Sequence, residues 1–527
     1  MYVNRDIPTM SPAERWIIAM TVMLGAFIAV MDTSVVNVAL PHMMGSFSQD
    51  LSAITWVATS YSIAEIIMIT MAGWWSALIG RKNLFLASFA LFTLGSVLCG
   101  TATNFEQMIA YRILQGIGGG ALIPVSQAIL RETFPAEQQG MAMALYGMGV
   151  VLAPALGPTF GGWLTDSYGW PWIFYINVPI CIGGMVLVNR FVHDPDYLRR
   201  GVQSIDWFGI ALLAVSLTGM QIVLERGQEE NWFESPVILW GTVVTATAFL
   251  LLIFWELRAK DPVVNLRVLK NRNLSLGAVM GLIFGVSLFG TTFILPQFTQ
   301  RILGYSAYDA GLVMAPRAIT LMLFMPLAGW LYRRVGARAL ITLGIGLIVW
   351  SYAELTRLNT QAGFWDMVPT LMIMGAGMPF MFVSLSTVSL STVDRSNMTD
   401  ASSVYTLARR VGGNIGYAVV ATLLSQGIQV HRFYLSAHVT DLDHISQTYR
   451  ASLSELLRHL GMNAASTSKA ALVMLDRMLD TQATMMAYND ISRVFGLLFL
   501  ILLPFVALVP SKSQILGLIK ARSTGKA

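Results

Sequence analysis

The sequence predicts an all-α integral membrane protein made of two six-helix bundles with two further helices inserted between them. Composition is the first indication: of 527 residues, 55% are hydrophobic and only 12% are charged, about half the charge of an average soluble domain. The second is a series of apolar runs, each long enough to cross a bilayer, which takes about twenty residues. The third is a turn motif, G-W-x5-G-x-[KR], found at 73–82 and again at 329–338.

Fourteen membrane spans follow from the apolar runs. They cover residues 16–40, 54–76, 83–101, 106–130, 138–164, 170–189, 205–225, 235–256, 273–296, 306–332, 338–356, 367–391, 402–427 and 491–510. The first span is too long for a signal peptide, and Ser11, Pro12 and Glu14 before it form a helix-start pattern. We therefore expect it to remain a membrane helix.

The distribution of basic residues orients these spans. With both termini cytoplasmic, the inner loops are basic and the short outer loops hold only Arg226, Arg301 and Arg357. The basic residues of the inner loops are Arg81, Lys82, Arg131, Arg190, Arg199, Arg200, Arg258, Lys260, Arg267, Lys270, Arg272, Arg333, Arg334, Arg338 and Arg395. This pattern predicts a multi-pass membrane protein with both termini on the cytoplasmic side. The basic residues behind the net charge of +5 thus lie in loops that orient the spans, and the charge does not indicate nucleic-acid binding.

The repeated motif gives the domain organisation. Its first copy follows span two and its second follows span ten, so the copies are eight spans apart. Two six-span halves joined directly would place the copies six spans apart, which leaves two extra spans between the halves. We infer an N-terminal bundle at 1–189, a linker with the inserted pair at 190–272, and a C-terminal bundle at 273–527. Glycine permits a close approach in such a turn, so we expect Gly73, Gly80 and Arg81 to take part in gating. Duplicated bundles are typical of secondary transporters.

One outer segment, residues 428–490, is far longer than the other loops. Leucines at 453, 456, 457 and 460, and apolar residues between 471 and 479, recur at helical spacing. We expect two amphipathic helices here. They form either a packed cap or a docking surface for another protein.

Three ionisable residues lie within the spans of the N-terminal half: Asp32, Glu65 and Arg112. Each costs roughly 2.5–3.5 kcal/mol to insert, so each requires a reason. A carboxylate that alternates between an apolar environment and an arginine can bind and release a proton. The alternative is a structural role, as packing or capping groups or, for Arg112, as a lock between spans. Arg317 is ambiguous, and we expect the Arg409–Arg410 pair at the cytoplasmic end of its span, where the side chains reach water.

Span five contains paired prolines and small residues, at Pro154, Gly157, Pro158, Gly161 and Gly162. Such a pattern kinks a helix and lets a neighbour pack closely. It fits either a hinge for conformational change or a static contact.

The chain shows no enzyme signature: no phosphate loop, no metal-spaced histidine cluster and no nucleophile triad. We therefore expect no metal and no cofactor. The ionisable residues in the spans indicate a proton gradient as the energy source. Cys99 and Cys181 lie in spans, which excludes a disulfide scaffold. Thirty methionines and 26 phenylalanines allow an adaptable apolar cavity. The polar residues that we expect to contact substrate in it are Asn37, Tyr61, Gln297 and Tyr405.

The ordered motifs of the chain resemble those of the major facilitator superfamily, in particular its fourteen-span drug:proton antiporters of the EmrB/QacA type. They are D-T-S-V-V-N-V-A-L-P (32–41), R-I-L-Q-G-I-G (112–118), A-P-A-L-G-P-T-F-G-G (153–162), W-P-W-I-F-Y-I-N-V-P (170–179), D-W-F-G (206–209) and A-R-R-V-G-G-N-I-G (408–416). Together they cover nearly the whole chain.

The resemblance implies the major facilitator fold and proton-driven efflux of hydrophobic or cationic drugs, with Asp32 as a coupling carboxylate that Arg112 influences. It also implies a periplasmic adaptor and an outer-membrane channel as partners. The chain departs from the family at Ala77 and Leu78, where relatives carry a gating Asp and Arg, at Thr70, where they have Pro, and at Glu65, where they tend to have Asn. We expect Glu65 to be a second titratable site.

Other functions fit the same spans. The chain could export a single metabolite or fatty acid class by the same mechanism, or serve as a membrane sensor or scaffold. A sensor has little use for three buried charges and a hinge, so transport is favoured.

Overall fold

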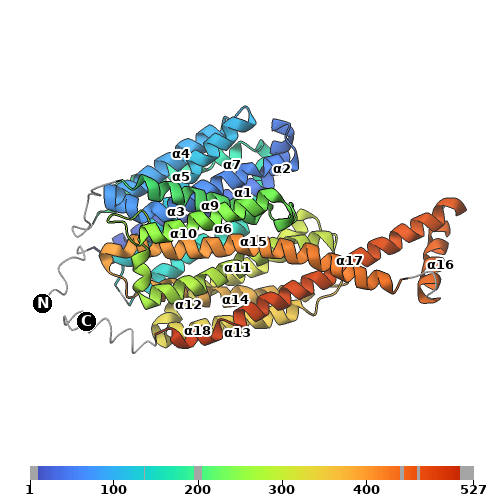
Figure 1. Cartoon of the computed structure of the whole chain (residues 1–527). Helices are drawn as coiled ribbons and strands as arrows, with labels where there is room; N and C mark the ends of the chain where they lie inside the picture. Colours follow the sequence, from blue (N-terminus) through green and yellow to red (C-terminus); the bar gives the residue numbers. More distant parts are fainter. Residues whose placement is uncertain (1–9, 136, 195–204, 440–443, 460–462, 511–527) are drawn as a thin grey trace.

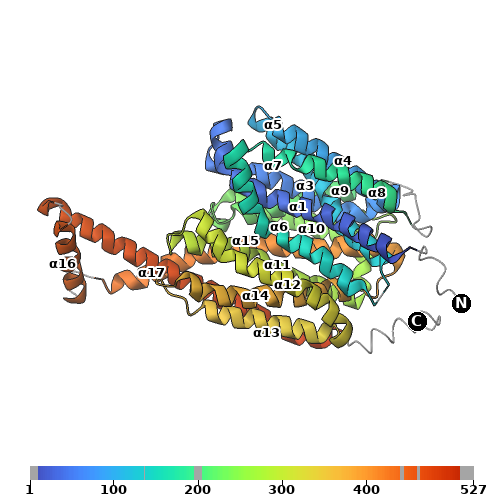
Figure 2. The ribbon, with the colours of Figure 1, turned by 180° about the vertical axis from the view of Figure 1, so that it is seen from behind.

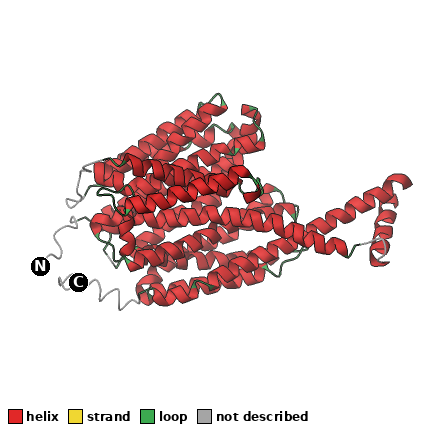
Figure 3. Cartoon of the chain, viewed as in Figure 1, coloured by secondary structure: helices red, strands yellow, loops and turns green. Residues whose placement is uncertain are grey.

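The computed structural model describes residues 10–135, 137–194, 205–439, 444–459 and 463–510. Throughout these ranges the chain is helical with connecting loops, and they contain no strand (Figure 3). Most of the segment that we expected to be the first linker, residues 195–204, lies outside the described residues.

The N-terminal half consists of six long membrane helices, the last of them interrupted. They are α1 (Pro12–Phe47), α3 (Trp56–Ile79), α4 (Arg81–Gly100), α5 (Phe105–Thr133), α6 (Gln139–Tyr168) and the pair α7 (Trp172–Tyr175) and α8 (Asn177–Phe191), with the single-turn α2 (Leu51–Ile54) after the first. Ser11 caps α1 through a capping box with Glu14, as its sequence pattern predicts.

Two further helices separate this half from the C-terminal half. They are α9 (Trp207–Arg226) and α10 (Pro236–Glu256). The C-terminal half then consists of α11 (Arg272–Arg301), α12 (Ala307–Val335), α13 (Ala337–Leu355), α14 (Phe364–Ser389), α15 (Met398–Ala437), α16 (His444–His459), α17 (Ala464–Leu500) and α18 (Leu503–Leu508).

A helix lies at each of the fourteen expected span positions. Within the described residues, twelve helices are long and apolar enough to cross a membrane, and the bent helix α6 makes thirteen. The remaining expected span, 402–427, corresponds to α15. Its apolar sequence is interrupted by Asp400, Arg409, Arg410 and Asn414. Polar residues in a spanning helix face the bundle interior, and α15 accordingly lies between α11 and α3.

The two halves meet along two seams. One seam is α6 against α12 and the other is α3 against α15, and Figures 1 and 2 show the N-terminal helices on one side of these seams and the C-terminal helices on the other. The inserted α9 and α10 lie over the second seam, because α9 contacts both α3 and α15 (Figure 1). The first residues of α1 and the last residues of α18 lie on the same side of the bundle (Figure 1). We call this side the terminal end.

The repeated motif forms the same turn twice at the terminal end. Gly80 joins α3 to α4 with φ of 86°, and Gly336 joins α12 to α13 with φ of 83°. A positive φ favours glycine, so both turns depend on the glycine that the motif repeats.

The long outer segment is more helical than we expected. Instead of a loop with two helices, α15 continues to Ala437 and α17 starts at Ala464, so both project beyond the bundle and carry α16 between them (Figure 1). We call residues 428–439 with 444–490, where described, the extension. Arg432 of α15 clamps it by pairing with Asp476 and Asp480 of α17. The hydrogen bond to Asp480, with Asp476 beside it, raises the pKa of Arg432 above its usual value.

Candidate functional site

A buried ion pair lies at the centre of the N-terminal half. Arg112 of α5 donates from Nη1 to Oδ2 of Asp32 on α1 at 2.6 Å, and the two residues are 0% and 2% exposed. The other carboxylate oxygen, Oδ1, accepts hydrogen bonds from Gln115 Nε2 at 2.8 Å and from Asn177 Nδ2 at 3.1 Å. Helices α1, α5 and α8 therefore meet at this one carboxylate.

Arg112 is held by further contacts with α3, where Tyr61 in turn bonds to α1. Its Nε donates to the carbonyl of Val57 at 2.9 Å, and its guanidinium carbon lies 4.2 Å from the ring centroid of Tyr61. The Tyr61 hydroxyl donates to the carbonyl of Ala29 at 3.2 Å. Tyr61, which we expected to contact substrate, is thus placed against the arginine and is 0% exposed.

The arrangement around Asp32 can accommodate both protonation states. When Asp32 is ionised, Arg112 balances its charge and the two amides donate to it. Amides both donate and accept, and Asn177 Oδ1 is buried with no hydrogen-bond partner among the described residues. A neutral Asp32 could donate to that oxygen, while Arg112 would lose its counter-charge. Asp32 is thus a buried carboxylate with one cationic partner, two amide donors and an unpartnered amide oxygen on Asn177.

A second buried ion pair joins the two halves. Arg410 of α15 donates from Nη2 to Oε2 of Glu65 on α3, and Glu65 is 1% exposed. Our expectation that Arg409 and Arg410 lie at the end of their span is wrong. The reason is that α15 begins at Met398, which places Arg410 about 18 Å along the helix, where it pairs with a carboxylate instead of reaching water.

Arg81 links the halves at the terminal end. It pairs with Glu132 at the end of α5, and it donates from Nε to Thr399 Oγ1 at 2.8 Å and from Nη2 to the carbonyl of Arg395 at 3.0 Å. Positions 77 and 78 hold Ala and Leu and carry no charge, so the contacts of Arg81 form the polar link in this turn.

Glycines bring the backbones of opposite halves together at the same end. A Cβ on Gly73 would lie 1.7 Å from Oδ1 and 3.0 Å from Cα of Asp400. On the other seam, a Cβ on Gly329 would lie 2.9 Å from a backbone oxygen of α6. The seam loosens away from the terminal end, since a Cβ on Gly311 would meet Thr159 only at 3.9 Å.

Helix α6 is bent where its prolines lie. Its segments Gln139–Pro154 and Leu156–Tyr168 make an angle of 46°, and Pro158 lies one turn further on. Proline removes a backbone donor and clashes with the preceding turn, which accounts for the bend.

The small residues of α6 pack against α1 next to the buried ion pair. A Cβ on Gly157 would lie 2.5 Å from Ser34 Cβ, and one on Gly161 would lie 2.8 Å from Val35 Cγ1. Gly162 is less crowded, with its nearest neighbour at 3.8 Å. The bent part of α6 therefore packs directly against the residues of α1 that follow Asp32.

The other expected substrate contacts lie on separate helices. Asn37 is exposed on α1, Gln297 is partly exposed on α11, and Tyr405 is buried on α15. Among the described residues, no hydrogen bond or ring contact joins these three, so their role stays a prediction.

Sequence reasoning missed several residues of the site. Gln115 and Asn177 complete the shell of Asp32, and Glu132 completes that of Arg81. The signal for Gln115 was its position three residues after Arg112 inside an apolar span. Asn177 gave a similar signal, as an amide inside the apolar sixth span.

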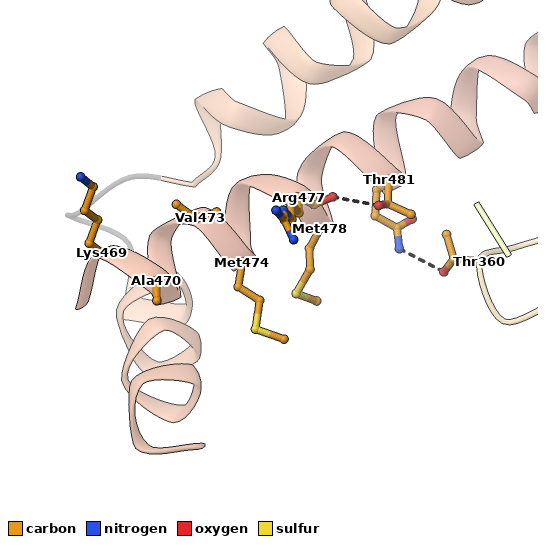
Figure 4. A pocket seen from close by; sticks show the side chains of 9 residues that line it. Thr360, Lys469, Ala470, Val473, Met474, Arg477, Met478 and Thr481 are labelled. Carbon is orange, nitrogen blue, oxygen red and sulfur yellow. Dashed lines mark hydrogen bonds between the residues drawn. The ribbon is translucent and has the colours of Figure 1, made fainter. Parts of the chain in front are cut away.

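The extension carries a groove of about 820 Å³ along α17 (Figure 4). Val473, Met474 and Met478 line it, with Lys469 and Arg477 among the remaining residues. These apolar side chains are between 39% and 47% exposed, an arrangement typical of a contact surface.

The described residues contain no group of three or more His, Cys, Asp or Glu able to hold a metal ion.

Comparison with known proteins gives concordant matches. Residues 22–417 match the sequence profile of the Major Facilitator Superfamily. The chain is 32% identical over 94% of its length to "Multidrug export protein EmrB" of Escherichia coli strain K12, of which it covers 95%. It is 31% identical over 95% of its length to "Fatty acid resistance protein FarB" of Neisseria gonorrhoeae, covering 97%. In fold it is similar to the proton:xylose symporter XylE, with a TM-score of 0.59 at 15% identity, over 97% of this chain and 100% of that one.

Proposed function

Because this chain belongs to the Major Facilitator Superfamily and is therefore a secondary transporter rather than an enzyme, we propose that it exports hydrophobic and cationic toxic compounds in exchange for protons. The observation that carries the proposal is the Asp32–Arg112 pair, a carboxylate buried in the N-terminal half with amide partners suited to either protonation state. The names of the multidrug and fatty acid resistance relatives support export of apolar compounds.

In the proposed cycle, a proton that reaches Asp32 from outside the cell neutralises it and frees Arg112 from its counter-ion. The change is transmitted to the bent helix α6 through the tight contact between Gly157 and Ser34. Glu65 adds a second step, because its pair with Arg410 joins the halves and protonation of Glu65 weakens that link. The halves then rock about the two seams and alternate the access of the substrate.

We further propose that the terminal end faces the cytoplasm and that the protein lies in the inner membrane. The basic turns at 81–82 and 333–338 lie at that end, as the positive-inside rule requires. The extension then projects into the periplasm.

Transport in inverted membrane vesicles tests the coupling. With an imposed pH gradient and ethidium as substrate, the native chain is expected to dissipate the gradient, Asp32→Asn to abolish this response, and Glu65→Gln to reduce it. Asp166→Asn, which removes an exposed carboxylate of α6, is the matched control and should behave as the native chain. Full coupling in Asp32→Asn would refute the assignment of Asp32, and full coupling in Glu65→Gln would refute that of Glu65.

The extension suggests a partner protein, and the resemblance to EmrB-type permeases favours a periplasmic adaptor that leads to an outer-membrane channel. We propose that the adaptor contacts the groove of α17. Charged substitutions in the groove, Met474→Asp with Met478→Asp, should leave vesicle transport intact and abolish protection of whole cells. Leu456→Asp, at an exposed position of α16, is the control. Undiminished protection by the groove variant would refute the docking site.

A further inference from the structure

Within the described residues, Arg112, Arg317, Arg409 and Arg410 lie inside spanning helices away from the helix ends, and they differ in their partners. Arg112 pairs with Asp32 and Arg410 pairs with Glu65. Arg317 and Arg409 are 8% and 5% exposed, yet neither forms an ion pair with a carboxylate of the described residues. An unbalanced buried cation is costly and marks a functional position in a membrane protein.

Arg409 lies between the two halves in an aromatic environment. Its guanidinium carbon is 5.1 Å from the ring centroid of Phe382 on α14. It interacts electrostatically with Tyr146 of α6, whose hydroxyl also lies within hydrogen-bonding range of the guanidinium, and with Tyr405, one turn earlier on its own helix. Its Nη1 is buried and has no hydrogen-bond partner within the described part of the chain. This nitrogen is a donor without an acceptor.

Arg317 approaches the same face of α14 from α12. Its Nη2 donates to the sulfur of Met378 at 3.4 Å, and a thioether is a weak acceptor. Met378 and Phe382 are four residues apart on α14, and residues at this spacing lie one above the other on a helix face. The two unbalanced guanidinium groups therefore flank adjacent positions of one helix.

The surroundings supply a further donor and apolar walls. Gln127 of α5 donates to the Tyr146 hydroxyl oxygen at 3.2 Å and accepts from Ser402 of α15 at 2.8 Å. The Tyr146 hydroxyl can thus donate its own proton to another acceptor. Buried apolar side chains pack beside it: the ring centroid of Phe284 lies 6.4 Å from that of Phe382, and a Cβ on Gly147 of α6 would lie 2.6 Å from Phe382 and 3.0 Å from Met325.

We propose that Arg409 and Arg317 form a subsite for the anionic head group of an amphipathic carboxylate whose apolar body lies among the Met and Phe side chains. A carboxylate supplies the counter-charge that both arginines lack and accepts charge-assisted hydrogen bonds from them. The inference rests on the proposed export of hydrophobic compounds and adds to it an anionic class of substrate.

Equilibrium binding to the purified full-length protein in lipid nanodiscs tests this subsite without requiring transport. Three twelve-carbon probes separate charge from apolarity: dodecanoate, dodecyltrimethylammonium and dodecanol. We expect Arg409→Gln and Arg317→Gln each to weaken dodecanoate binding by about tenfold or more, since a hydrogen bond to a charged group is lost. Binding of the cation should be unchanged or tighter. Arg333→Gln, at an exposed position of α12, is the matched control.

Two results would overturn the proposal. One is unchanged dodecanoate affinity in both arginine variants, and the other is a parallel loss of all three probes, which indicates a structural role. If a glutamine variant does not fold, Arg409→Lys and Arg317→Lys replace it and are expected to bind dodecanoate more weakly than the native chain but more tightly than dodecanol. Equal affinity for these two probes refutes the subsite.

The proposed antiport is tested separately by the vesicle assay. Arginine-dependent dodecanoate binding with no proton exchange for any substrate would reject antiport and retain the subsite. Proton exchange with ethidium, together with equal binding of the anionic, cationic and neutral probes, would retain antiport and reject the subsite.

Discussion

Replacement of Gly73 by alanine should open the terminal end of the transporter. Gly73 lies on α3, where it meets α15 of the other half, and a Cβ there would come within 1.7 Å of Asp400 Oδ1. The carboxylate can swing aside, but Asp400 Cα, at 3.0 Å, belongs to the backbone. The two helices must therefore separate, while each half keeps its own packing.

The cost can be worked out from these contacts. Overpacking of one methyl group costs about 1–3 kcal/mol. Movement of Asp400 also breaks the hydrogen bond that Asn265 Nδ2 donates to it at 2.9 Å, worth about 1 kcal/mol. A penalty of about 2 kcal/mol or more, applied only when the terminal end is closed, shifts the closed-to-open ratio about thirtyfold.

Distances between spin labels measure that shift. Cysteines introduced at Asn83 and Arg333 place one label on each half, both at exposed terminal-end positions, while the native Cys99 and Cys181 are buried. We expect a longer-distance population in Gly73→Ala. The matched control is an alanine at position 346 of α13, where a Cβ meets nothing within 4 Å. Identical distance distributions in the two variants would refute the reasoning.

Two further predictions concern the ion-pair shell and the extension. Gln115→Leu removes a hydrogen-bond donor to Asp32 and should slow proton-coupled transport in vesicles by about tenfold. Ser96→Ala, which removes only a hydroxyl that accepts from Gln115, should change the transport rate little. Equal rates in the two variants would contradict a role for the amide. The pKa of Arg432 is raised in the folded state, so its clamp is fully present below the usual arginine value and is lost only as pH rises through the higher one. Hydrogen-exchange protection of the extension should thus be constant between roughly pH 6 and pH 9, and a fall within that window would contradict this.

The sequence predicted the spans well because apolar runs of this length have few alternatives in a bilayer. It also indicated Asp32 and Arg112, since a charge in a span is conspicuous. It did not indicate that Arg410 would pair with Glu65, 345 positions away, because this contact arises only when α3 and α15 meet across the seam.

The extension illustrates another limit of sequence reasoning. The leucine spacing indicated helices in 428–490 correctly, but it did not reveal that α15 and α17 continue without a break from the membrane. Hydropathy falls where a helix leaves the bilayer, although its backbone hydrogen bonding continues. A span that ends by composition therefore need not end as a helix.

The inserted helices have a consequence for how compounds reach the protein. Glu225 of α9 accepts a hydrogen bond from Thr59 of α3, and Gln221, one turn earlier, accepts one from Asn414 of α15. Together with α10, this helix covers one of the two seams on its bilayer side. At the other seam, the helix that contacts both α6 and α12 is α14, which belongs to the C-terminal half. The inserted pair therefore shields one seam from lipid, and the seam along the bent helix α6 is built from the two halves alone.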